Sequence, residues 1–200
     1  MGLLPVEFYQ SDAVVSLAQQ LLGKVLVTDF PAGRTAVMIT EVEAYEGPID
    51  KASHAFGNRK TKRTTTMYLS GGCAYIYLCY GIHHLFNIVT APAGVPHAIL
   101  LRGGEPLEGI DIMLQRRKMD RLAYRMTAGP GTVAQALGLT TKLDGQSLQG
   151  PNIWVEDRGI QITPEQIKAG PRIGVDYAED HAQWPYRLWL KESPWVSRPR

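Results

Sequence analysis

The stretch TAVMITEVEAY, residues 35–45, is the longest strand pattern in the chain. Side chains alternate between the two faces of a strand, so one face would carry Val37, Ile39, Glu41, Glu43 and Tyr45. A carboxylate on an apolar face is costly to bury unless it has a partner or a function. The pattern therefore predicts a central strand on which the two glutamates are unusual. The alternative is a partly exposed strand whose glutamates pair with surface Lys or Arg side chains.

The rest of the chain surrounds this strand with short elements of both kinds. We expect helices to begin at Ser11, at Glu108 and after Gly131. Further strands are expected over residues 24–28, 74–80, 84–90, 98–102, 152–156, 173–175 and 186–190. No regular alternation of strand and helix and no repeat is visible. The predicted class is α+β: a single domain, residues 1–200, with a curved, mainly antiparallel β-sheet, flanking short helices and a protruding β-hairpin.

Composition favours a soluble protein with its own core. A chain of 200 residues with 44% hydrophobic content can bury a stable core without disulfides. Its two cysteines, Cys73 and Cys79, are expected to be free thiols in a reducing compartment. Nowhere do eighteen apolar residues follow one another, so no membrane partner is expected. The expected location is the cytoplasm, with nucleoid association if the source is bacterial.

Positive charge is unevenly distributed, although the net charge is only +2. One cluster contains Arg59, Lys60, Lys62 and Arg63, and a second contains Arg116, Arg117, Lys118, Arg121 and Arg125. Such clusters bind phosphates in nucleic-acid-binding proteins, but more often they are solvated surface. On charge alone, both interpretations stay open.

Water activation by a carboxylate is the simplest chemistry that the sequence offers. Glu43 would suit this role if Tyr45 and Tyr77 formed the walls of a pocket around it, with Arg102 as the cation that orients the water. No zinc-ligand spacing, nucleophile elbow or phosphate-binding glycine loop is present in the sequence. We therefore expect no metal and no cofactor.

The tyrosines of the expected hairpin differ in what they suggest. Tyr80 lies beside Gly81 at the turn, where a large aromatic side chain has nothing obvious to pack on. An aromatic wedge at a tip suits insertion between stacked bases. Tyr75, by contrast, is adequately explained as a good strand residue. A lone histidine such as His54 is more often structural than a ligand-binding residue.

Several ordered motifs resemble the alkyladenine (3-methylpurine) DNA glycosylase family, and together they span nearly the whole chain. They are EVEAYEGP (residues 41–48) followed by His54, AYIYLCYG (74–81), FNI (86–88), LLR (100–102), EPLEG (105–109), GPG (129–131), GPRIGV (170–175) and SPWVS (193–197). One difference is Thr132, where many members have a lysine. That difference puts a phosphate or backbone contact at this position in doubt.

The resemblance implies a role for each matching residue. Glu43 matches the general base that activates water for attack on the deoxyribose C1′ atom. Arg102 and the carbonyl group of Ile173 match groups that place this water. The residues matching the pocket for the flipped base are Tyr45, His54 and Tyr77, with Asn87 excluding the amino group of undamaged guanine. Tyr80 matches the tyrosine that fills the gap left in the duplex.

The expected function is then that of a monofunctional glycosylase, acting as a monomer on double-stranded DNA with alkylated purines. Alkylation at N3 or N7 makes a purine cationic, which favours stacking on tyrosine by about 0.5–2 kcal/mol. It also makes the base a good leaving group, so an activated water suffices. Arg59, Lys60, Lys62 and Arg63 would hold phosphates. The alternatives are a non-catalytic DNA-lesion-binding protein and, less favoured, a hydrolase or transferase acting on nucleosides or RNA.

Overall fold

The computed structural model describes residues 2–198, and the strands in that range form one antiparallel sheet. The strands are β1 (Gly2–Leu3), β2 (Val25–Phe30), β3 (Gly33–Tyr45), β4 (Ala74–Cys79), β5 (His83–Thr90), β6 (His97–Glu108), β7 (Ile153–Asp157), β8 (Ile167–Gly170) and β9 (Arg187–Leu190). The α-helices are α1 (Val14–Leu21), α2 (Ile110–Arg117) and α3 (Pro130–Leu137), and short 3-10 helices include Asp176–Gln183. This confirms the α+β class.

Strand β3 lies at the centre of the sheet. The order is β1-β7-β2-β3-β6-β5-β4, and β9 pairs with both β3 and β8. The first half of β3 pairs with β2. Farther along β3, residues Glu41–Glu43 pair with Arg187–Trp189 of β9 on one side and with β6 on the other. The β3–β6 register shifts on both sides of Glu41, which interrupts the simple alternation expected there. Both glutamates have 0% exposure, so the partly exposed alternative is wrong.

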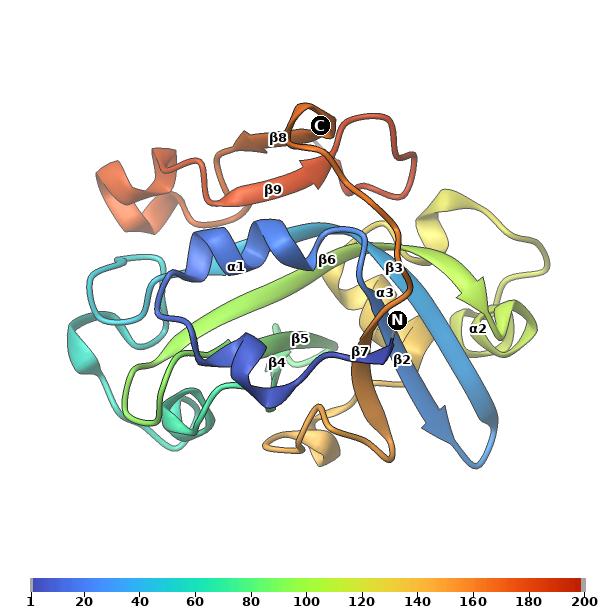
Figure 1. Ribbon diagram of the computed structural model, residues 1–200, viewed down its shortest axis with the longest axis horizontal. Coiled ribbons are helices and arrows are strands. Elements are labelled where there is room, and N and C mark those ends of the chain that lie inside the picture. Colours follow the sequence, from blue (N-terminus) through green and yellow to red (C-terminus); the bar gives the residue numbers. More distant parts are fainter. Residues whose placement is uncertain (1, 199–200) are drawn as a thin grey trace.

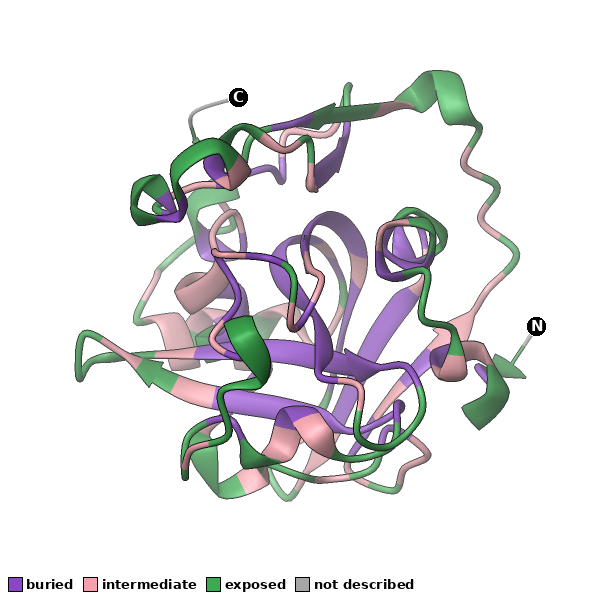
Figure 2. Ribbon diagram, turned by 90° about the vertical axis from the view of Figure 1, so that its left-hand side faces the viewer, coloured by how far each residue is buried: buried purple, intermediate pink, exposed green. Residues whose placement is uncertain are grey.

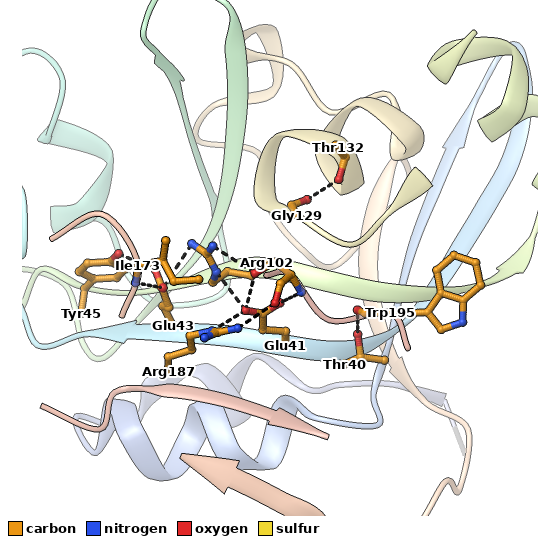
Figure 3. A network of polar contacts seen from close by, with 11 residues as sticks. Thr40, Glu41, Glu43, Tyr45, Arg102, Gly129, Thr132, Ile173, Arg187 and Trp195 are labelled. Carbon is orange, nitrogen blue, oxygen red and sulfur yellow. Dashed lines mark hydrogen bonds and ion pairs between the residues drawn. The ribbon is translucent and has the colours of Figure 1, made fainter. Parts of the chain in front are cut away.

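Helices cover the sheet on both sides. Figures 1 and 3 show α1 and α3 on opposite sides of β3. The expected helix after Ser11 is confirmed as α1, because Val14, Leu17 and Leu21 recur at helical spacing and are all buried. The largest hydrophobic cluster joins these residues to Val133 and Leu137 of α3 and to Val42 and Ala44 of β3. The sheet is thereby fixed on each side of the glutamates.

Two strand predictions were wrong. The strand expected to stop at Gly103 continues to Glu108 as β6. The two glycines allow neighbouring segments to pack closely against β6. A Cβ atom on Gly103 would lie 2.4 Å from the carbonyl oxygen of Trp195, and a Cβ atom on Gly104 would lie 2.7 Å from the Val37 side chain. Residues 173–175, expected as a strand, form an irregular loop, whereas the unexpected strand β8 precedes it.

The β4–β5 hairpin projects from the body of the molecule, as predicted. In Figure 2 it extends toward the left of the view and its tip is exposed. Cys73 and Cys79 are free thiols, as expected. Within residues 2–198, no helix is long and apolar enough to cross a membrane.

Candidate active site

A cavity of about 560 Å³ lies where β3, β4, β5 and β6 meet the loop after β8. Predicted site residues lining it are Glu43, Tyr45, His54, Arg63, Tyr77, Tyr80, Asn87, Arg102 and Ile173. Its walls also include Met67, Tyr75, Leu100 and Tyr177. The other predicted phosphate-binding residues, Arg59, Lys60 and Lys62, do not line it. The fold thus brings together residues far apart in sequence, such as Glu43 and Ile173, which are 130 positions apart.

The Glu43 carboxylate is held by three different elements (Figure 3). Its Oε1 atom accepts a hydrogen bond from the Ile173 amide at 2.8 Å and lies 3.2 Å from Nη1 of Arg102. Its Oε2 atom accepts a hydrogen bond from the Tyr45 hydroxyl at 2.8 Å. Burial, followed by the charge of Glu43, raises the pKa of Tyr45 well above its usual value, so this hydroxyl stays a donor.

Glu41 has a different and fuller set of partners. Its Oε1 atom accepts hydrogen bonds from Nε of Arg187 at 2.6 Å, Nε of Arg102 at 3.1 Å and the Ser197 hydroxyl at 2.8 Å. Its Oε2 atom accepts one from the Ser197 amide at 2.6 Å. These four donors hold Glu41 in place, and Glu41, unlike Glu43, does not line the cavity. Its role is to anchor the C-terminal segment and Arg102.

Arg102 bridges the two glutamates. Burial lowers its pKa, but Glu43 and Glu41 raise it by more, so the guanidinium is held in its charged form. Its Nη2 atom also donates to the Ser197 hydroxyl at 3.2 Å. A buried cation beside two buried carboxylates compensates their charge, which is the condition for keeping such groups inside a protein.

Arg172 fixes the loop that carries Ile173, and the sequence analysis missed this role. It is buried, pairs with Asp50 through both guanidinium Nη atoms and donates to the Ala44 carbonyl at 2.9 Å. Its Cζ atom also lies 4.8 Å from the centre of the Tyr45 ring. This pair therefore positions the Ile173 amide on Glu43. An ion pair between positions 122 residues apart leaves no local pattern in a sequence.

An aromatic wall closes one side of the cavity. His54 Nδ1 is 3.0 Å from the Tyr75 hydroxyl, and its ring meets that of Tyr77 edge-on at 4.8 Å. Burial, with Arg63 and Arg59 nearby, lowers the pKa of His54 to about 4, so the imidazole is neutral at pH 7. Burial raises the pKa of Tyr75 to about 12. Tyr75 is therefore a cavity residue, which its strand propensity alone did not indicate.

Asn87 and Tyr80 occupy opposite environments. Asn87 is buried, and its side-chain amide donates to the Tyr75 carbonyl at 3.1 Å. Tyr80 is 92% exposed at the tip of the β4–β5 hairpin and has a left-handed backbone conformation with φ of 50°. The placement of Tyr80 at an exposed tip follows the prediction. Leu78 and Ile82, on either side of it, are exposed as well.

The two basic clusters differ in their surroundings. Lys60 and Lys62 are exposed, and Nζ of Lys60 lies 5.1 Å from the centre of the Tyr68 ring. In the second cluster, Arg116 donates to the Ala136 carbonyl at 3.0 Å and so ties α2 to α3. Arg116 therefore has a structural role in holding two helices together, in addition to contributing positive charge to the cluster. Thr132, in the first turn of α3, donates its hydroxyl to the Gly129 carbonyl at 2.8 Å (Figure 3).

Comparison with known proteins gives a consistent result. The family model described as Methylpurine-DNA glycosylase (MPG) matches residues 7–194. The chain belongs to this family. It is therefore a DNA glycosylase, an enzyme of DNA repair, as the motifs in the sequence implied.

Curated relatives extend over the same length. A protein of Chlamydia felis (strain Fe/C-56), named "Putative 3-methyladenine DNA glycosylase", is 47% identical over 189 residues, 94% of this chain and 96% of the relative. A protein of the same name from Bacillus cereus (strain G9842) is 43% identical over 202 residues, 97% and 98% of the two chains. In this glycosylase, residues 2–198 contain no group of three His, Cys, Asp or Glu side chains placed to hold a metal ion.

Proposed function

We propose that the protein acts as a monomer on double-stranded DNA and hydrolyses the N-glycosidic bond of alkylated purines with water activated by Glu43. The leading substrate is 3-methyladenine, followed by 7-methylguanine, with hypoxanthine and etheno-adenine as further candidates. One observation carries the proposal. Within residues 2–198, Glu43 accepts contacts from three donors and only Tyr45 contacts its Oε2 atom. This leaves one of about four acceptor sites for a water molecule.

For a purine made cationic by alkylation, the chemistry balances without a further reactant. The oxygen of the water forms a bond to C1′ of the deoxyribose while the bond between C1′ and the purine nitrogen breaks. The electron pair of that bond passes to the purine and neutralises the charge that alkylation created. Glu43 takes the proton of the water, as a general base does. Arg102 compensates the charge of the buried carboxylate.

The cavity is suited to a cationic purine. Tyr45 and Tyr77 line it, and tyrosine faces attract a cation by about 0.5–2 kcal/mol. The neutral state of His54 avoids a positive charge next to that base. His54 can hydrogen-bond to the base through the ring nitrogen that does not contact Tyr75, and Asn87 would crowd the amino group of an undamaged guanine.

Access to C1′ requires that the nucleotide leave the duplex. Flipping costs a few kcal/mol, and the cost is lowest at damaged or mispaired bases. The exposed ring of Tyr80, at the tip of a projecting hairpin, is suited to fill the gap. Arg59, Lys60, Lys62 and Arg63 would contact phosphates without reading sequence.

A panel of lesion-containing duplexes tests this function. Each duplex carries one lesion, and released bases are separated by chromatography while the DNA strand is checked for breaks. We expect free 3-methyladenine and an intact strand with an abasic site, because no lysine lines the cavity within residues 2–198 to form a Schiff base. Binding to the lesion duplex without release of any base would contradict hydrolysis and favour a non-catalytic lesion-binding protein.

A further inference from the structure

Two arginines line the cavity, and they differ in their partners. Arg102 faces two carboxylates. Arg63 forms no ion pair with any carboxylate in residues 2–198, and its Cζ atom lies 4.5 Å from the centre of the Tyr77 ring. Arg63 is also exposed, although its guanidinium reaches the cavity. Its contacts are therefore with the aromatic wall: a side-chain hydrogen bond with Tyr75, and the face of Tyr77, a ring that the proposed function assigns to the damaged base.

The charge of Arg63 acts on the inside of the cavity. After burial, Arg63 is the next cause of the low pKa of His54, ahead of Arg59. It also opposes the effect of burial on the pKa of Tyr75. The guanidinium thus influences the same aromatic wall that would receive a purine. A cation at this place disfavours a second cation, while one on a phosphate would favour DNA.

We propose that Arg63 covers the Tyr77 face on which the base stacks, and that it moves to a DNA phosphate when a flipped base enters. This inference rests on the proposed function and adds a specificity-determining residue to it. A guanidinium and a purine cannot occupy one ring face together. A phosphate offers Arg63 a charged, bidentate partner in place of an aromatic one. Contact between Arg63 and the DNA backbone therefore frees the Tyr77 face for the flipped base. A free base brings no phosphate, so it has to displace Arg63 without this compensating contact.

The proposal predicts effects of opposite sign for one substitution. Arg63→Ala removes the cover, so it strengthens binding of a free base, and it removes a phosphate contact, so it weakens binding of duplex DNA. An exposed cation–π contact that the free base no longer has to displace corresponds to about a two- to fivefold gain in affinity for that base. Loss of one phosphate contact reduces the slope of log affinity against log salt concentration by about one.

Equilibrium dialysis with 3-methyladenine measures the first effect. This free base is neutral after loss of the sugar, so a gain in affinity cannot come from removing charge repulsion. Lys62→Ala is the matched control, because Lys62 is an exposed cation of the same segment that does not line the cavity. We expect two- to fivefold tighter binding of 3-methyladenine by Arg63→Ala and wild-type affinity for Lys62→Ala. Both variants should bind an undamaged duplex more weakly.

Unchanged or weaker binding of 3-methyladenine by Arg63→Ala would overturn the proposal. Thermal unfolding confirms that each variant is folded, and Arg63→Gln, which retains a polar side chain, should change in the same direction. Base release from methylated duplex by the wild-type protein is followed in parallel. If the wild-type protein releases the base and Arg63→Ala binds 3-methyladenine with unchanged affinity, only the role of Arg63 is overturned. If the wild-type protein releases no base and Arg63→Ala binds 3-methyladenine more tightly, only the hydrolytic function is overturned.

Discussion

At the scale of single residues, the neighbouring carboxylates Glu41 and Glu43 are distinguished by their access to the cavity. Both are buried and both contact Arg102. Four hydrogen bonds hold Glu41, which does not line the cavity, whereas Glu43 lines it and keeps one acceptor site on its Oε2 atom. Strand periodicity indicated that these glutamates were unusual. Only the cavity, which is lined by residues from distant parts of the chain, shows that Glu43 is the one that could hold a water beside a substrate.

His54 gives a pH-dependent prediction at the same scale. Because its pKa in the folded protein is about 4 and the ordinary value is 6.5, the unfolded chain binds the proton first as the pH falls. The contribution of His54 to stability is therefore fully present above pH 6.5 and is lost progressively down to about pH 4. An NMR titration should show no protonation of the His54 ring between pH 8 and pH 5.5. A midpoint near 6.5 would contradict this, and a His54→Asn variant identifies the signal.

At the scale of elements, the β4–β5 hairpin projects away from the protein's own core and has an exposed tip. Tyr80 at its tip contacts little of the molecule, since 92% of it is exposed. The hairpin is nevertheless fixed at its base, where β5 pairs with β6 through Asn87 and Leu100. An exposed aromatic on a rigid support is the arrangement expected of a wedge.

Replacement of Tyr80 tests the wedge. Tyr80→Ala should change the free energy of unfolding by no more than about 0.5 kcal/mol, because the side chain is exposed. Excision from duplex DNA should fall by about five- to 150-fold, equivalent to the 1–3 kcal/mol of a stacking contact. Tyr80→Phe, which keeps the ring, should retain most of the activity. Equal activity of Tyr80→Ala and wild type on a duplex lesion would refute a wedge.

The sequence predicted the periodic elements well and the irregular ones poorly. Helix α1 and the β4–β5 hairpin follow from spacing that the structure preserves. Gly103 was read as a strand end, although it serves close packing against the carbonyl group of Trp195. Residues 173–175 have the composition of a strand, but the Arg172–Asp50 ion pair and the Ile173–Glu43 hydrogen bond hold them as a loop. Tertiary contacts of this kind override local propensity.

At the scale of the whole molecule, the candidate site is assembled from segments that lie far apart in the chain. Glu43 and Arg102 come from adjacent central strands, Ile173 from the loop after β8, and Ser197 from the C-terminal segment. The matching motifs in the sequence located most of these residues. Periodicity could not predict the contacts between them, because Ser197 and Glu41 lie 156 positions apart. Tyr75 was missed for the same reason, since its partner His54 comes from another segment.

The central claim is that Glu43 activates the water, and the single-turnover excision rate of Glu43→Gln tests it most directly. The amide keeps the shape of the side chain but cannot accept the proton, so we expect a rate about 10²–10⁴-fold lower on a 3-methyladenine duplex, with binding of that duplex largely retained. Circular dichroism establishes that the variant is folded, and Glu179→Gln makes the same change at an exposed carboxylate. A Glu43→Gln rate within tenfold of wild type would contradict the account.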